Sequence, residues 1–282
     1  MHFLELPLVI FTVLAQCAVG AYLLITFRLA CVKDAAMTKN LAVKCLFFVL
    51  GFMSLGFMSS TMHLGSPLRA FNSLNRVGAS GLSNEILTGS TFFAIAGVYW
   101  LSELLGIASQ SLRTILRYVG AVAGVIFMIA MIKVYLINTV PLWNTVFTPI
   151  EFGFTVITAG LLFGYFLLNA FDGSSVVANK RIAVVGMLLL ATHLVLTVAR
   201  VIEFAGVETS IHQGITMLND YSTMIMIQCV LWVIGGLFWG ISAHQTTNKV
   251  RFYSLCALVI VIAAEIFGRG VFYGMHFTFG LI

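Results

Sequence analysis

The sequence predicts an all-α integral membrane protein, a single domain built as a bundle of about eight transmembrane helices. Hydrophobic residues make up 60% of the 282 residues and charged residues only 9%, whereas soluble domains are about one quarter charged. The apolar runs are continuous and about twenty residues long, unlike the alternating segments of a transmembrane barrel. Such spans occupy residues 1–282 almost completely, so no separate soluble domain is expected.

The expected spans are apolar runs separated by short polar segments. In sequence order they cover about Leu8 to Phe27, Cys45 to His63, Ile86 to Leu105, Arg117 to Ile137, Ile150 to Phe171, Ile182 to Phe204, Tyr221 to Ala243 and Phe252 to Tyr273.

The distribution of basic residues predicts the orientation of the bundle. Short loops rich in Lys and Arg stay in the cytoplasm. The segments after the first, third, fifth and seventh spans hold ten of the fifteen basic residues: Arg28, Lys33, Lys39, Lys44, Arg113, Arg117, Lys180, Arg181, Lys249 and Arg251. Both termini are therefore predicted on the outer side.

One polar stretch, from His63 to Ile86, interrupts the otherwise apolar sequence. It contains Pro67, Gly78 and several serines and asparagines, whose backbone groups would be unsatisfied in hydrocarbon. It is therefore predicted to be a loop at the outer membrane surface. Two arginines within it, Arg69 and Arg76, oppose the overall charge trend. They suit either a carboxylate of a docked protein or lipid headgroups.

Ionisable residues within the spans concentrate near the outer side. Each costs about 2.5–3.5 kcal/mol at mid-bilayer on insertion scales, so each requires a partner or a function. The predicted outer layer comprises His63, Glu85, Lys133, Glu151, Arg200, Glu203, Glu265 and Arg269.

Simpler interpretations of these residues stay open. Glu265 and Arg269 stand four apart, and Arg200 and Glu203 stand three apart, so each couple is spaced to pair on its own helix. Lys133 is expected to extend to the interface. The mid-span His193 is expected to be an ordinary interior histidine.

The cysteines and glycines indicate packing and not cofactor ligation. The five cysteines include no C-x-x-C pair, so no metal site is expected in this protein. Glycines four apart allow close helix approach: Gly120 and Gly124, Gly160 and Gly164, Gly236 and Gly240, Gly270 and Gly274.

Two stretches carry a family resemblance. The run His63-Leu-Gly-Ser-Pro-Leu-Arg-Ala-Phe-Asn-Ser-Leu-Asn-Arg-Val-Gly-Ala-Ser80 with Ser83-Asn-Glu-Ile86, and the run Glu265-Ile-Phe-Gly-Arg-Gly-Val-Phe-Tyr-Gly-Met-His276, closely resemble the membrane anchor subunit of dimethyl sulfoxide reductases, the DmsC family. The resemblance extends over the whole length of the sequence.

This resemblance implies a location and partners. The protein would lie in the bacterial inner (cytoplasmic) membrane, with both termini on the periplasmic side. A ferredoxin-like subunit with several [4Fe-4S] clusters and a molybdopterin catalytic subunit would dock on the periplasmic face. No metal or haem is expected in this protein itself, and menaquinol would bind as its substrate.

His63 and Glu85 are the candidate catalytic residues. They flank the polar stretch, and a quinol that is oxidised must give up two protons. A histidine and a partly desolvated glutamate are suitable acceptors. The spacing alone leaves open whether these are ordinary residues at a loop edge. The resemblance favours the quinol site, because the matching residues of the family are taken to act there.

The remaining site residues fall into two sets. The expected quinol-binding residues are Ser66, Arg69, Arg200, Glu265 and Arg269, and the expected partner-docking residues are Arg69, Asn72, Asn75 and Arg76.

The favoured function is a membrane anchor that oxidises menaquinol and passes electrons to the docked iron–sulfur subunit. The terminal reduction would occur in the partner, so this protein would be only the quinol dehydrogenase part of an oxidoreductase complex. Protons and electrons would leave on the same side, which predicts an electroneutral step. The alternatives are a b-type haem quinol dehydrogenase subunit, for which His193 lacks an obvious second histidine, and a proton-coupled transporter.

Overall fold

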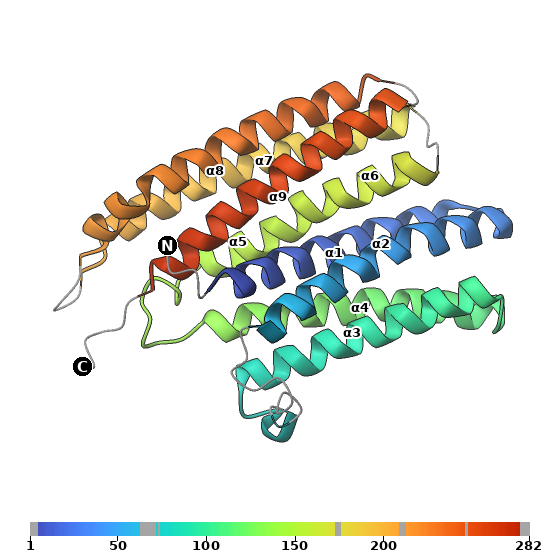
Figure 1. The fold of residues 1–282 in the computed structure, drawn as a ribbon, viewed down its shortest axis with the longest axis horizontal. Coiled ribbons are helices and arrows are strands. Elements are labelled where there is room, and N and C mark those ends of the chain that lie inside the picture. Colours follow the sequence, from blue (N-terminus) through green and yellow to red (C-terminus); the bar gives the residue numbers. More distant parts are fainter. Residues whose placement is uncertain are drawn as a thin grey trace.

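Long antiparallel helices run side by side through the structure (Figure 1). The structure is a computed structural model that describes residues 5–62, 72, 74–172, 176–208, 213–245 and 248–276, without the side chains of 176–179. The helices are α1 (Leu6–Cys31), α2 (Ala35–Met62), α3 (Gly81–Leu105), α4 (Gln110–Tyr135), α5 (Phe147–Thr155), the π-helical turn η3 (Val156–Gly160), α6 (Leu161–Phe171), α7 (Val176–Ala205), α8 (Gly214–Ser242) and α9 (Asn248–Gly274). The predicted all-α class is confirmed.

Seven of these rods are long and apolar enough to cross a membrane, with α5, η3 and α6 counted as one continuous rod. The helix α3 has a comparable length of 25 residues and packs along α4 and α2, but it carries Asn84, Glu85 and Glu103. The molecule is therefore a multi-pass membrane protein.

The helices extend beyond the predicted spans. Lys39 and Lys44 lie on α2 and Arg113 lies on α4, although the sequence predicts all three in connecting segments. Helical hydrogen bonds continue into the interface, where water satisfies polar side chains, so hydropathy alone underestimates the helix lengths.

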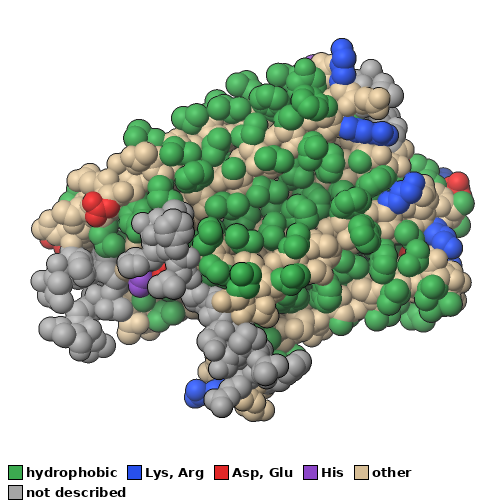
Figure 2. Space-filling view, in the orientation of Figure 1, with side chains coloured by type: hydrophobic (Ala, Val, Ile, Leu, Met, Phe, Trp, Pro, Cys, Tyr) green, Lys and Arg blue, Asp and Glu red, His purple; other side chains and the backbone are tan. Residues whose placement is uncertain are grey.

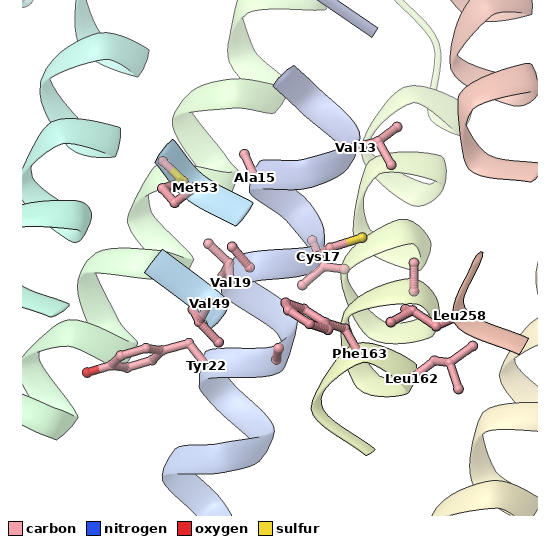
Figure 3. Packing of buried hydrophobic residues seen from close by; sticks show 14 of the residues in the cluster. Val13, Ala15, Cys17, Val19, Tyr22, Val49, Met53, Leu162, Phe163 and Leu258 are labelled. Carbon is pink, nitrogen blue, oxygen red and sulfur yellow. The ribbon is translucent and has the colours of Figure 1, made fainter. Parts of the chain in front are cut away.

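The helix α1 forms the centre of the bundle, in contact with α2, α4, η3, α6 and α9. Figure 3 shows its side chains Val13, Cys17 and Val19 among apolar residues of α2, α6 and α9. The rings of Phe52 on α2 and Phe163 on α6 stack with their centroids 4.1 Å apart. An apolar, close-packed centre therefore fixes the relative positions of the surrounding helices.

Two glycines bring α1 and η3 into backbone contact. A Cβ atom on Gly160 would lie 2.6 Å from the Cα of Gly20, and one on Gly20 would lie 2.7 Å from the Cα of Gly160. Both distances are shorter than any carbon–carbon contact allows. This close approach agrees with the packing role predicted for Gly160.

The two ends of the bundle differ in charge. The terminus end comprises residues 74–80, 136–146, 206–208 and 276. The basic end comprises the turns at residues 32–34, 106–109, 172 and 243–245 together with the helix ends next to them, which carry Arg28, Lys33, Lys39, Lys44, Arg113, Arg117, Lys180, Arg181, Lys249 and Arg251. Figure 2 shows hydrophobic side chains over the middle of one face and most of its Lys and Arg side chains at the basic end, on the right.

At the basic end, two ion pairs join neighbouring segments near water. Arg28 Nε donates to Asp172 Oδ2 at 2.6 Å, and Arg113 Nη1 donates to Glu103 Oε2 at 2.8 Å. The arginine side chains are 30% and 17% exposed. These pairs explain why Glu103 lies apart from the other acidic residues of the spans.

At the terminus end, the described part of the polar stretch leads into α3 through a capped turn. Gly78 has a positive φ of 86°, and its N–H donates to Asn84 Oδ1 at 2.7 Å. The Ser80 side chain then caps α3 by accepting a hydrogen bond from the Ser83 N–H at 3.5 Å. As a result, α3 begins at Gly81, and Glu85 lies inside the helix and not at its edge.

Candidate functional site

A network of buried polar side chains links six segments of the bundle. It extends from the terminus end toward the middle of the helices. We call this set the buried network; its members are Gln16 on α1, Glu151 and Thr155 on α5, Thr158 on η3, His193, Thr197 and Arg200 on α7, Trp232 on α8, and Glu265 and Arg269 on α9.

An ion pair joins α5 to α7 within the buried network. Arg200 Nη1 donates to Glu151 Oε2 at 3.0 Å, and the Thr197 hydroxyl donates to Glu151 Oε1 at 3.0 Å. Both charged residues are almost fully buried, at 6% exposure for Glu151 and 3% for Arg200. Without this mutual compensation, either charge would be very costly at this depth.

The carboxylate of Glu265 has its own set of donors. Its Oε2 accepts from the Thr155 hydroxyl at 2.8 Å, and its Oε1 accepts from Trp232 Nε1 at 3.2 Å. The Thr158 hydroxyl lies 3.5 Å from the same Oε1. Glu265 is therefore held by three neighbouring side chains, one each from α5, η3 and α8.

Arg269, one turn further along α9, reaches toward α1 and α5. Its Nη2 donates to Gln16 Oε1 at 3.0 Å and to the Thr155 hydroxyl at 3.2 Å. Its guanidinium carbon lies 3.6 Å from the centroid of the Phe152 ring, a cation–π contact. Gln16 completes the link by donating to the backbone carbonyl of Phe152 at 3.3 Å.

His193 lies between the two carboxylates. Its Nε2 is 3.8 Å from Glu151 Oε2, and its Nδ1 is 3.7 Å from Glu265 Oε1. Neither ring nitrogen has a hydrogen-bond partner among the described residues. The ring packs against that of Trp232 at 4.2 Å, so both nitrogens remain directed at carboxylates.

The π-helical turn η3 aligns donors for this arrangement. It follows Thr155 directly, and the hydroxyls of Thr155 and Thr158 both face Glu265. Single π-helical turns inside α-helices are rare and occur frequently at functional sites. The sequence predicts one span from about Ile150 to Phe171, which the structure confirms, and the π-helical turn lies within that span.

A pair of tyrosines lies between the buried network and Glu85. Tyr273, one turn beyond Arg269 on α9, donates to the hydroxyl of Tyr135 on α4 at 2.7 Å. Tyr135 is the last residue of α4, beside the start of α3, where a Cβ atom on Gly81 would lie 3.5 Å from the Cα of Val134. Polar side chains thus follow one another from His193 to the start of α3.

Glu85 itself is buried at the terminus end. The residue is 2% exposed, and its Oε1 has no hydrogen-bond partner among the described residues. A buried carboxyl oxygen without a partner is costly and is a frequent mark of a binding or catalytic role. Among the predicted catalytic residues, Glu85 is the one whose surroundings the structure describes.

Several predicted site residues lie outside the described residues or at the surface. His63, Ser66 and Arg69 are outside the described residues. Asn72, Asn75 and Arg76 are exposed at the terminus end, as a docking role would require.

The structure brings together Arg200, Glu265 and Arg269, which the sequence assigned to one site, but it changes their partners. Arg200 pairs with Glu151 on another helix, while Glu203 is exposed. Glu265 and Arg269 likewise bond to other helices and meet through the shared hydroxyl of Thr155. Neither local pairing considered from the spacing is what the structure records.

Other polar residues were missed or assigned a minor role. The sequence predicts an ordinary interior histidine at His193 and gives no prediction for Gln16, Tyr135 and Tyr273. Their only sequence signal is a polar group inside an apolar run. Lys133 is exposed, in agreement with the expected interfacial position. Among the described residues, no group of three or more His, Cys, Asp or Glu side chains is placed to hold a metal ion.

The fold and the site together define a polytopic membrane protein with an ionisable interior toward one end of its helices. The family of DMSO reductase anchor subunits (DmsC) matches residues 1–275. The protein belongs to this family.

Individual relatives agree over nearly the full length. The protein is 38% identical to the C subunit of the anaerobic dimethyl sulfoxide reductase of Escherichia coli over 281 residues, which cover 98% of this sequence and 96% of the relative. It is 37% identical to the YnfH subunit of the same organism over 278 residues and 36% identical to the C subunit from Haemophilus influenzae over 280, with the same coverage of both sequences. This protein is therefore a membrane anchor of the DMSO reductase type.

Proposed function

We propose that this protein oxidises menaquinol at its terminus end and passes the electrons to an iron–sulfur subunit docked there. The observation that supports this most directly is Glu85, a buried carboxyl group with an unpartnered oxygen among the described residues, beside the polar stretch 63–80. Family membership supports the anchor role. The quinol chemistry is the step that we add.

The proposed reaction balances within the complex. A quinol releases two protons and two electrons as it becomes a quinone. We assign the proton-accepting roles to His63 and Glu85, which then pass the protons to water. The electrons leave to [4Fe-4S] clusters of a ferredoxin-like partner and reach a molybdopterin subunit that reduces an S- or N-oxide.

The other predicted site residues divide by exposure. Ser66 and Arg69 remain our proposed direct contacts of the quinol. Arg200, Glu265 and Arg269 are each 5% exposed or less and are bonded to protein groups. We therefore propose that these three shape the wall behind the pocket, with Tyr273 and Tyr135 between them and Glu85. Asn72, Asn75, Arg76 and Arg69 would contact the docked partner.

The substitution Glu85→Gln tests the proposal in the purified complex. It keeps the size of the side chain and removes the proton acceptor, so quinol-driven reduction should fall by about 10²–10⁴-fold, the usual contribution of a general base. Reduction driven by an artificial dye that bypasses this subunit should be unchanged. The matched control is Glu203→Gln, an exposed carboxylate on α7. Unimpaired quinol oxidation by the Glu85 variant would contradict the assignment.

A proton-translocating role is the second candidate, because the buried network reaches deeper than the sequence predicted. Gln16 and Thr158 lie near the middle of their rods, and η3 interrupts one of them, features that transporters also use. Our proposal instead releases protons and electrons at one end. Vesicles containing the complex should therefore build no membrane potential during quinol-driven turnover. A potential that collapses in a His193→Phe variant would favour translocation.

A haem-binding role is disfavoured by the surroundings of His193. Both of its nitrogens face carboxylates at less than 4 Å, so an iron atom would have to displace Glu151 or Glu265.

A further inference from the structure

A groove between α7 and α8 at the basic end has no role in the proposed quinol chemistry. It has a volume of about 890 Å³. Its walls are mainly apolar, and basic or histidine side chains lie at its mouth. The lining comprises Lys180, Arg181, Val184, Val185, Met187, Leu237, Gly240, Ile241, Ala243 and His244.

Tight packing along one edge of α7 and α8 forms the floor of this groove. A Cβ atom on Gly186 would overlap the Trp239 ring, and one on Gly240 would lie 2.9 Å from Met187 Sδ. The helices therefore touch at these points. Val184 and Leu237 remain 49% and 62% exposed beside them. In a membrane, such exposed apolar walls face lipid chains.

A second crevice continues the apolar surface around α7. It has a volume of about 260 Å³ and lies between α1, η3, α6 and α7, where Val185 lines both spaces. Its lining is entirely apolar: Gly20, Leu23, Leu24, Val156, Ile157, Leu161, Val185 and Leu189. An acyl chain that leaves the groove past Val185 therefore meets a further slot of the same character.

The charge at the mouth selects the kind of head group. Lys180 and Arg181 are adjacent and exposed, and none of the described residues lining the groove is acidic. Two cations without an acidic partner among the described residues attract a phosphodiester. A quinol head is uncharged and would leave both cations unused. Basic pockets between transmembrane helices commonly hold anionic lipid head groups.

We propose that this groove is a binding site for an anionic phospholipid. The phosphodiester lies between Lys180, Arg181 and His244, and an acyl chain follows the walls of Val184, Val185 and Leu237. The site is at the basic end, away from the terminus end to which we assign the quinol and the docked partner. The lipid would hold α7, which carries His193 and Arg200, against α8.

Native mass spectrometry of the purified complex, released from nanodiscs, tests the proposal. The discs contain phosphatidylcholine alone or an equal mixture with phosphatidylglycerol, whose acyl chains are the same. The wild-type complex should retain phosphatidylglycerol in preference to phosphatidylcholine. Each cation removed should weaken the preference by about fivefold, so that the Lys180→Gln/Arg181→Gln variant largely loses it.

Two further variants separate binding at the groove from general surface charge. The control Lys33→Gln/Lys39→Gln removes two exposed lysines at the same end and should retain the lipid as the wild type does. The variant Val184→Trp keeps both cations and fills the groove, and it should release the lipid. Equal retention of the two lipids, or wild-type retention by the groove variants, would overturn the proposal. The readout needs no turnover, so it is independent of the quinol assignment.

Discussion

Charged side chains in the two halves of the bundle have different surroundings. At the basic end, Arg28 and Arg113 pair with Asp172 and Glu103 near the rim, where the arginines stay in part exposed to water. In the half of the bundle next to the terminus end, the interior charged residues are each 6% exposed or less: Glu151, Arg200, Glu265 and Arg269. In the rim pairs the carboxylates are buried, at 0% and 2% exposure, but the arginines reach water. In the interior, both partners of the pair between Glu151 and Arg200 are buried, so each charge depends on compensation by protein groups. A fold that needed only stability would not require the second arrangement.

Removal of an interior charge should have the largest effect. The substitution Arg200→Ala leaves Glu151 buried with no cation bonded to it, and it should lower the free energy of unfolding by about 3–5 kcal/mol. Thermal unfolding of the detergent-solubilised protein measures this loss. The double variant Arg200→Leu/Glu151→Leu should recover part of it, because no uncompensated charge then remains. No recovery would contradict the role of Glu151 as the partner.

Removal of a rim charge should cost less. The substitution Arg28→Ala takes one charged hydrogen bond from Asp172, whose side chain is 0% exposed, but the Arg28 side chain is 30% exposed, so water can enter the space that it leaves. We expect a loss of about 1–2 kcal/mol in the same unfolding assay. A loss equal to that of Arg200→Ala would remove the distinction between the two halves.

The tyrosine pair should contribute a neutral hydrogen bond. The substitution Tyr273→Phe removes the donor to Tyr135 and keeps the ring packing, so the stability loss should be about 1 kcal/mol. If the pair also positions Glu85, quinol-driven turnover should fall by more than the loss of folded protein accounts for, while dye-driven turnover stays constant. Tyr22→Phe is the control, since Tyr22 bonds to the Arg117 carbonyl away from Glu85.

The smallest change in the free energy of unfolding is expected at Glu203, three residues after Arg200, where the largest change is expected. Glu203 is on the same helix as Arg200 but is exposed, so Glu203→Gln should change the unfolding free energy by less than about 0.5 kcal/mol. A larger effect would mean that the local pair considered from the spacing matters after all. The comparison of these two residues therefore isolates burial from position in the sequence.

The sequence predicted the helical class and the order of the spans because a run of apolar residues directly reports helix length in a membrane. It also located most of the interior charges by depth. It did not reveal their partners, because depth along a helix does not state which face is turned to which neighbour. Arg200 thus had Glu203 as an apparent partner, while Glu151 lies 49 residues away in the sequence.

Two features of the site had weak sequence signals. His193 is a single polar residue in an apolar run, and its position between two carboxylates depends on the packing of α5, α7 and α9 together. The turn at Val156–Gly160 has an ordinary apolar composition. The contact of Gly160 with Gly20 and the hydroxyl of Thr158 facing Glu265 both lie within this turn, and both involve residues distant in the sequence.

The turn η3 also uncouples the two parts of its rod. A π-helical turn takes in one more residue than an α-helical turn. The side chains of α6 are therefore rotated about the common helix axis relative to the directions that a continuous α-helix from α5 would give them. On α5, Glu151 and Thr155 point to the polar interior, and on α6, Phe163 points to the apolar surface of α2. Deleting one residue between 156 and 160 would rotate α6 by about 100°. One residue in this turn therefore sets how the apolar part of the helix is rotated relative to the part that carries Glu151 and Thr155.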